Sequence, residues 1–143
     1  MQFTGFDARG YRMVDVRSGY AGWAGSYEDS VADVMDLALL DELSTVDWPA
    51  VRRAADLGCG TGRTGAWLRE RGVEAIDGVD LTPEMLAVAR ERGVFRDLVE
   101  ADVAETGLPG GAYDMAITSL VDEHLADLRP IYAEAARLAP VYV

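Results

Sequence analysis

Residues 56–65 read Asp-Leu-Gly-Cys-Gly-Thr-Gly-Arg-Thr-Gly, and this glycine-rich stretch decides the fold. It follows a short apolar run and precedes a helical pattern, which is the order of a strand, a tight loop and a helix. Counted from Gly60, it has the Gly-x-Gly-x-x-Gly spacing of a dinucleotide-binding turn. Counted from Asp56, it is an acidic residue followed by glycines at positions 58, 60 and 62. Both spacings predict a loop whose backbone lies against a ligand.

Strand and helix patterns alternate on both sides of this loop. We expect the strands at 53–57, 74–80, 98–103, 113–120 and 141–143, and helices at 61–71, 82–93 and 128–138. Thr82-Pro83-Glu84 is a helix start with a capping hydroxyl and a proline at the first helical position. Further upstream, Ser30 predicts a helix with Asp33 as its capping-box partner. That helix should end at Trp48-Pro49 and carry an apolar stripe that includes Leu39.

The alternation predicts an α/β protein with a Rossmann-like doubly wound parallel sheet. The connection between the third and fourth strands has about ten residues, which can reach about 30 Å. Crossing three strand spacings needs only about 15 Å, so the third strand can lie at an edge while the fourth pairs beside the first. We expect residues 1–50 to form an N-terminal helical segment and residues 51–143 to form the core.

The composition excludes some classes of partner. Lys plus Arg is 13 and Asp plus Glu is 25, giving a net charge of −12, which disfavours nucleic acid and anionic membrane surfaces. The single cysteine, Cys59, allows no internal disulfide and no multi-thiolate zinc site, so no metal is expected. The N-terminus has no signal-peptide pattern and no apolar run is long enough to span a bilayer, which favours the cytoplasm. The oligomeric state is not indicated.

Asp56 distinguishes the two readings of the glycine loop. Asp80 comes twenty residues after Gly60 and could bind ribose hydroxyls in either case. A carboxylate at the mouth of the loop would face a diphosphate with like charge, at a cost on the order of a few kcal/mol. The same carboxylate would attract the ammonium and sulphonium charges of S-adenosylmethionine (SAM). Electrostatics therefore favours SAM over a dinucleotide.

Residues 20–139 resemble a class I SAM-dependent methyltransferase of the small-molecule type, similar to quinone C-methyltransferases. Four segments carry the resemblance: residues 56–62, Gly78-Val-Asp-Leu-Thr-Pro-Glu-Met-Leu86, Glu100-Ala-Asp102 and Tyr113-Asp-Met-Ala-Ile-Thr-Ser119. The resemblance implies a sheet order of 3-2-1-4-5. It also implies methyl transfer from SAM to a small-molecule acceptor, with S-adenosylhomocysteine as the product.

The resemblance also implies a set of cofactor-binding residues: Asp56, Gly58, Cys59, Gly60, Asp80, Leu81, Met85, Asp102, Val103, Ser119, Tyr20 and Tyr27. In this set the glycines flank the methionine moiety, Asp80 binds the ribose, and Leu81 and Met85 cover the adenine. Asp102 accepts from the adenine amino group with Val103 beside it, Ser119 lies under the methionine end, and the two tyrosines fold over the cofactor. The alternatives are that Asp80 only caps the next helix, that Asp102 is a solvated acid and that Ser119 only terminates a strand. Met85 could instead belong to the core, and the tyrosines could pack an N-terminal helix.

His124 is the only histidine, and it lies in Asp122-Glu123-His124 after the fourth predicted strand. A general base is chemically sensible there, because the transferred methyl group should emerge at that strand end. The alternative is a solvated histidine at the start of a helix, and Asp122 and Glu123 compete for the role of base.

The resemblance fails at the C-terminus: the glycine-rich turn usual before the fifth strand is missing between Leu138 and Val141, and relatives continue through a full fifth strand, another helix and an antiparallel hairpin. We therefore expect a core that is C-terminally truncated, and we carry three hypotheses. The first is SAM-dependent methyl transfer, the second is a non-catalytic SAM-binding module or fragment, and the third is an NAD(P)-dependent oxidoreductase, which Asp56 disfavours.

Overall fold

The computed structural model describes residues 14–30 and 35–143, and its centre is a parallel sheet of order β3-β2-β1-β4-β5. The strands are β1 (Arg53–Leu57), β2 (Ala75–Asp80), β3 (Asp97–Glu100), β4 (Met115–Ile117) and β5 (Val141–Tyr142). All five predicted strands are present, and the predicted sheet order is confirmed. The connection from β3 crosses the sheet, so that β4 pairs directly with β1.

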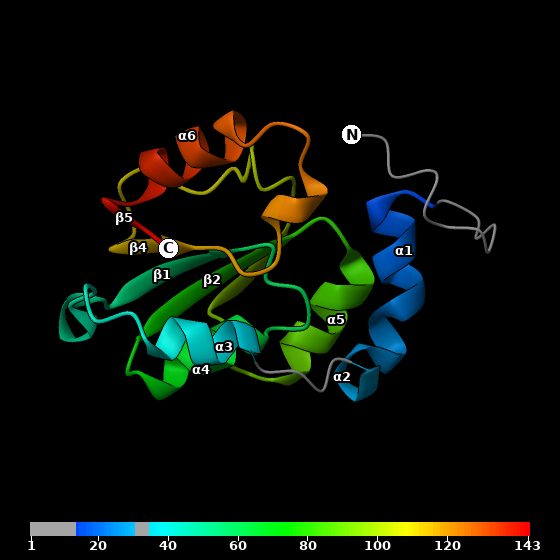
Figure 1. The fold of residues 1–143 in the computed structure, drawn as a ribbon, viewed down its shortest axis with the longest axis horizontal. Helices are drawn as coiled ribbons and strands as arrows, with labels where there is room; N and C mark the ends of the chain where they lie inside the picture. The colour runs from blue at the N-terminus through cyan, green and yellow to red at the C-terminus, as the bar shows by residue number, and fades with distance from the viewer. Residues whose placement is uncertain (1–13, 31–34) are drawn as a thin grey trace.

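The crossover helices cover both faces of the sheet (Figure 1). They are α4 (Arg63–Glu70), α5 (Pro83–Glu91) and α6 (Arg129–Leu138). Right-handed crossovers in one direction, from β1 to β2 to β3, bring α4 and α5 to the same face. The crossover from β4 to β5 runs in the opposite direction, which brings α6 to the other face. The architecture is the predicted doubly wound one.

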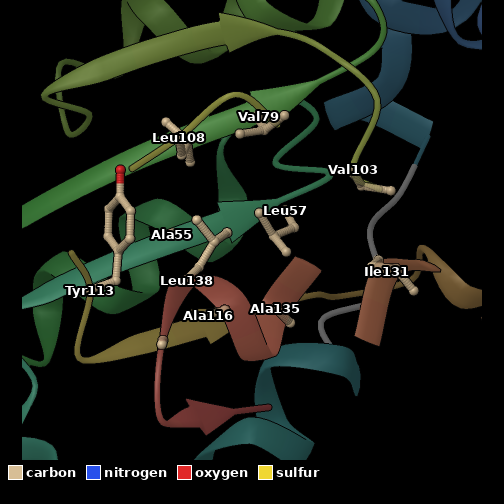
Figure 2. Packing of buried hydrophobic residues seen from close by; sticks show 11 residues of the cluster. Ala55, Leu57, Val79, Val103, Leu108, Tyr113, Ala116, Ile131, Ala135 and Leu138 are labelled. Carbon is tan, nitrogen blue, oxygen red and sulfur yellow. The ribbon is translucent and has the colours of Figure 1, made fainter. Parts of the chain in front are cut away.

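The core between the sheet and α6 is formed by apolar side chains from alternate strand positions (Figure 2). Ala55 and Leu57 from β1, Ala116 from β4, and Ile131 and Leu138 from α6 are all inaccessible to solvent. Because residues of β1 alternate between faces, Ala54 and Asp56 point to the opposite side, toward α4. Both faces also contain a buried acid: Asp77 beside Tyr113 on the α6 face, and Asp56 on the α4 face.

The core on the α4 face contains Ala54, Trp67, Leu68 and Ile76. It is extended by Trp48 from the short turn η3 (Trp48–Ala50), whose ring meets that of Trp67 edge-on at 5.0 Å. The N-terminal segment therefore completes this side of the hydrophobic core as well as covering the strand ends.

The N-terminal segment, defined here as the described residues 14–30 and 35–50, is a series of short helices (Figure 1). They are α1 (Val16–Trp23), η2 (Ala24–Ser26), α2 (Tyr27–Ser30) and α3 (Met35–Asp41), followed by η3. α1 and η2 pack against α5.

The expected single helix from Ser30 to Trp48 is wrong. Ser30 is the last residue of α2, and Asp33, its predicted capping partner, lies outside the described residues. Leu39 is 63% exposed, whereas Leu37 and Leu40, outside the predicted stripe, pack against the α4-face core. The pattern was read over one long helix, but α3 is short and its orientation is set by tertiary packing.

Three local predictions near the site also need correction. The side chain of Thr82 makes no capping hydrogen bond; the carboxylate of Asp80 instead accepts from the Thr82 N–H at 2.8 Å. α4 begins at Arg63 because Gly62 is its N-cap in a left-handed conformation, with φ of 87°. β4 is shorter than expected because Tyr113 lies before it in the core, donating its hydroxyl to Asp77 at 2.7 Å.

Candidate functional site

A cavity of about 300 Å³ lies at the carboxyl ends of β1, β2 and β4, where ligands bind in open α/β sheets. Eleven of the thirteen predicted site residues line it: Tyr20, Tyr27, Gly58, Gly60, Asp80, Leu81, Met85, Asp102, Val103, Ser119 and His124. The fold thus brings together residues from both ends of the chain. Asp56 and Cys59 are not part of the cavity wall.

The backbone of the glycine loop forms one wall of the cavity. The N–H groups of Gly58 and Cys59 both donate to the carbonyl of Val79, at 2.7 and 2.9 Å, which ties the loop to the end of β2. Gly58 has φ of 74°, and a Cβ there would come within 2.4 Å of Val121. Gly60 has φ of 51°, and a Cβ there would meet nothing within 4 Å. Since Gly60 lines the cavity, that open space is available to a ligand.

Asp80 is held rigidly at the end of β2. One carboxylate oxygen accepts from the Gly60 N–H at 2.9 Å, and the other accepts from the Thr82 N–H at 2.8 Å. The carboxylate thus joins the glycine loop to the start of α5, which agrees with the helix-capping alternative. Each carboxylate oxygen can accept more than one hydrogen bond, so Asp80 can still accept from a ligand in the cavity.

Asp56 lies beneath the glycine loop rather than at its mouth, and it is 1% exposed. Burial, and secondarily the charge of Asp80, raises the pKa of Asp56 to about 7, while a hydrogen bond from the Gly65 backbone acts in the opposite direction. Within the described residues, Oδ2 of Asp56 has no hydrogen-bond partner. Strand alternation explains this position, because Asp56 shares the face of Ala54 and points toward the first turn of α4.

Cys59 is also buried under the loop. A Cβ on Gly78 of β2 would lie 2.8 Å from the Cys59 sulphur, so the thiol fills the space that this glycine leaves. Burial raises the pKa of the Cys59 thiol, which keeps it protonated and unreactive. The structure places Cys59 as packing below the loop.

The opposite side of the cavity is apolar. Leu81 and Leu120 are exposed large hydrophobic residues that line it, and Met85 is buried at its base. Leu120 has φ of 57°, a strained backbone conformation for a residue other than glycine. Such strain concentrates at binding sites, where the surrounding structure holds it in place.

The N-terminal segment closes the cavity through polar contacts with the core. Arg92, which directly follows α5, pairs with Glu28 at 2.7 Å, and the Thr61 hydroxyl donates to the same carboxylate. The Tyr20 hydroxyl and His124 Nε2 are 2.8 Å apart. These contacts hold α1 and α2 against the strand ends.

A second polar link joins α3 to β4. Asp36 accepts from Arg63 at 3.1 Å and from the Ser119 hydroxyl at 3.3 Å. Ser119 therefore lines the cavity with its hydroxyl held by the N-terminal segment.

Sequence reasoning missed five cavity-lining residues: Val16, Thr82, Leu120, Val121 and Leu125. Val16 could have been found, because Asp15 accepts from the Ser18 N–H at 3.0 Å and is a typical N-cap for α1. The three residues Leu120, Val121 and Leu125 lie close in sequence to the predicted site residues Ser119 and His124. They belong to an irregular loop, so no periodic pattern in the sequence could indicate them.

Within residues 14–30 and 35–143, the structure has no group of three or more His, Cys, Asp or Glu side chains suited to a metal ion. In the same residues, each helix is too short or too polar to span a bilayer.

Comparison with known proteins identifies the family. The family described as "Methyltransferase domain" matches residues 55–140, more than half of the chain. The chain belongs to the class I SAM-dependent methyltransferases. The matched region of this methyltransferase domain contains β2, β3, β4, most of β1, the glycine loop and most of the cavity wall. The predicted family is confirmed.

Individual methyltransferases are similar over part of their length. The chain is 35% identical over 125 residues to malonyl-[acyl-carrier protein] O-methyltransferase of Serratia marcescens, covering 86% of this chain and 48% of that protein. It is 37% identical over 98 residues to demethylmenaquinone methyltransferase of Thermus thermophilus, covering 64% and 44%. The crystal structure of a SAM-dependent methyltransferase from Mesorhizobium loti matches with a TM-score of 0.59 and 29% identity, covering 78% and 50%. The chain spans about half the length of the curated relatives it matches.

Proposed function

We propose that this methyltransferase chain binds SAM in the cavity at the strand ends and takes part in methyl transfer to a small-molecule acceptor. The observation that carries the proposal is the convergence of eleven predicted residues on one cavity. They come from the N-terminal segment, the glycine loop, the end of β2, the turn after β3 and the end of β4. A chain that resembled the family only in its glycine loop would not be expected to bring these residues together at one cavity.

The residues of the cavity fit the parts of SAM. The open space above Gly60 is a backbone cradle for the amino-acid part. The carboxylate of Asp80, fixed by two backbone amides, can accept from ribose hydroxyls. Leu81 and Met85 offer an apolar surface for the adenine, and Asp102 is exposed at the same cavity.

The charge of the wall favours SAM over NAD(P). Asp80 and Asp102 are the carboxylates among the lining residues, and neither Arg nor Lys is among those that the structure describes there. Asp56 adds a buried acid below the loop. A diphosphate would find no cationic partner in this wall, whereas a sulphonium and an ammonium would be attracted to it.

When bound, SAM supplies an electrophilic methyl group with a neutral thioether as the leaving group. The chain's own residues bind and orient the cofactor, and this positioning can supply much of the rate. The relatives' names include an acyl-carrier-bound malonyl group and demethylmenaquinone as acceptors. We therefore propose a small-molecule acceptor and no nucleic acid partner, and a cytoplasmic location stays a prediction.

Isothermal titration with SAM, S-adenosylhomocysteine and NAD tests the proposal. SAM and S-adenosylhomocysteine should bind, and NAD should not. The variant Gly60→Ala should lose at least about tenfold in SAM affinity, since its methyl group enters the ligand space. Gly72→Ala is the matched control: Gly72 also has positive φ (88°) and no atoms within 4 Å of a Cβ, but it does not line the cavity.

The control separates ligand contact from backbone strain. Both variants should lose about 1 kcal/mol of stability, as alanine is strained at positive φ. Only Gly60→Ala should lose affinity. NAD binding with no SAM binding would overturn the proposal, and equal affinities in the two variants would remove the glycine loop from the site.

A further inference from the structure

Tyr20 and His124 are 104 positions apart in the sequence and meet in the cavity wall. The Tyr20 hydroxyl oxygen lies 2.8 Å from His124 Nε2, and the two rings meet edge-on with their centroids 5.4 Å apart. Both side chains line the cavity. The contact joins α1 to the turn η4 (Asp122–His124) that follows β4. A hydroxyl and an imidazole in direct contact at a ligand cavity form a potential path for a proton.

The direction of this hydrogen bond follows from acidity. A phenol is a much stronger acid than the N–H group of a neutral imidazole, so the favoured neutral arrangement is Tyr20 O–H donating to Nε2. Burial raises the pKa of Tyr20, with smaller contributions from Tyr27, Glu123 and Asp80, so the phenol keeps its proton. Nε2 is then the acceptor, and the free lone pairs of the Tyr20 oxygen remain available to a third group.

The charged groups described around the pair are acidic. Glu123 Oε1 lies 4.0 Å from His124 Nε2, and Asp122 is in the same turn. From the facing elements, Asp80 and Tyr27 lie near Tyr20 and add no positive charge. Acidic side chains therefore lie next to the imidazole end of the pair.

We propose that Tyr20 and His124 act together as a proton relay for an acceptor that must lose a proton in order to be methylated. The acceptor's O–H or N–H proton passes to the Tyr20 oxygen while the Tyr20 proton passes to His124 Nε2. On the acceptor, the methyl group replaces that proton, and the electron pair of the broken carbon–sulphur bond stays on sulphur. The inference depends on the proposed function and adds Tyr20 as a catalytic residue.

The relay also selects the class of acceptor. A carboxylate has already lost its proton at neutral pH and would need a cationic partner, which the described cavity lining does not supply as Arg or Lys. The site thus fits a neutral, weakly acidic group such as a phenolic hydroxyl, held against the apolar side chains of Val121 and Leu125.

The single histidine makes the relay measurable in the chain as it stands. Nitrogen-15 NMR of histidine-labelled protein at pH 8 reports the two ring nitrogens of His124 alone. We expect a neutral ring with its proton on Nδ1 and a hydrogen-bonded Nε2. Tyr20→Phe should shift the Nε2 resonance toward that of a free, unprotonated nitrogen. Tyr142→Phe, which removes a hydroxyl bonded to Thr118 away from the cavity, should leave both resonances unchanged.

Two results would overturn the relay. One is a doubly protonated ring at pH 8 in the unmodified chain, which would indicate a cationic site for a carboxylate. The other is a His124 spectrum that Tyr20→Phe does not change. Millimolar phenol should shift the Nε2 resonance in the presence of S-adenosylhomocysteine, and benzoate should not. A stronger effect of benzoate, or no effect of either probe, would overturn the acceptor class.

Calorimetric titration of the same labelled sample with SAM distinguishes the relay proposal from the proposed function. SAM binding together with an unchanged Tyr20→Phe spectrum rejects the relay alone. A chain that binds no SAM rejects the proposed function, whatever the NMR spectrum shows.

Discussion

The two walls of the cavity are held in different ways. The strand-end wall is fixed by backbone: Asp80 accepts from two backbone N–H groups, and the glycine loop is bonded to the carbonyl of Val79. The wall from the N-terminal segment is fixed by side chains, such as the pair Arg17–Glu100 at 2.6 Å, whose side chains are 51% and 47% exposed. One wall is part of the sheet, and the other is attached to it.

Because of this difference, we expect the strand-end wall to be rigid and parts of the N-terminal wall to be more mobile. Buried, close-packed elements move little, whereas exposed ion pairs each contribute about 0–1 kcal/mol and weaken in salt. The strand-end wall should therefore keep its shape without a ligand. In the N-terminal wall, exposed pairs hold α1 and α2, so we expect these two helices to move more readily than the strand ends, whereas the mostly buried pair Asp36–Arg63 and packing on Trp67 anchor α3 and η3.

The largest effect should come from the core beneath the strand-end wall. Leu68 of α4 is fully buried, so Leu68→Ala should reduce the free energy of unfolding by about 2–5 kcal/mol through loss of burial and formation of a cavity. Leu39→Ala in the N-terminal segment is the matched control, because Leu39 is 63% exposed and should change stability by less than about 0.5 kcal/mol. Urea denaturation measures both, and equal losses would contradict the contrast.

The next effect is a pH dependence caused by Asp56. Its pKa is about 7 in the folded chain and 3.8 in the reference state, so the folded state binds more protons between these values. Stability should therefore fall as pH rises from about 4 to 7 and then level off. Asp56→Asn should remove this decline, which amounts to a few kcal/mol, and be the more stable variant at pH 8.

Denaturation of both forms between pH 4 and 8 tests the role of Asp56. A chain whose stability falls equally in the two forms would show that another group is responsible. SAM affinity should also rise with pH in the unmodified chain, because a cationic ligand favours the ionised carboxylate.

An intermediate effect is expected at the ribose position. Asp80→Ala should weaken SAM binding by about 1–3 kcal/mol, roughly tenfold to hundredfold, because ribose hydroxyls lose their acceptor. Asp97→Ala is the control, since Asp97 is an exposed acid at the start of β3 and does not line the cavity. Calorimetry that found the two variants equally affected would show that only overall charge matters.

The smallest effect should come from the ion pairs of the N-terminal wall. A double-mutant cycle on Glu28→Gln and Arg92→Gln should give a coupling of about 0.2–1 kcal/mol, because both side chains are partly exposed. Amide hydrogen exchange in α1 and α2 measures this coupling energy. The exchange in these helices should become faster in 0.5 M salt. Protection that did not respond to salt would show that this wall is as firmly held as the other.

The sequence predicted the strand-end wall well because its signals are local. The switch from strand period to a glycine loop located β1 and the loop, and Asp80 followed from its distance to Gly60. The length of the connection after β3 allowed β4 to pair with β1, and the family resemblance implied this order, which is confirmed. Each of these features depends on residues close together in the chain.

The N-terminal wall could not be predicted to the same depth, because its geometry depends on distant contacts. The bond between Ser119 and Asp36 spans 83 positions, and no periodicity encodes it. Asp56 was expected at the mouth of the loop, but it is buried below the loop, and this position depends on which face of β1 meets α4. That choice is made by the packing of Leu57 and Ala55 against α6 on the opposite face.

Two of the three tryptophans, Trp48 and Trp67, lie where the N-terminal segment meets the rest of the protein. Trp23 is on α1, Trp48 meets the Trp67 ring edge-on, and the indole N–H of Trp67 donates to Asp41 at 2.7 Å. Arg71 lies over the Trp67 ring at 3.8 Å from its centroid. Intrinsic fluorescence is therefore a built-in, label-free reporter of docking and release at this boundary. Stopped-flow mixing with a ligand could time the opening directly.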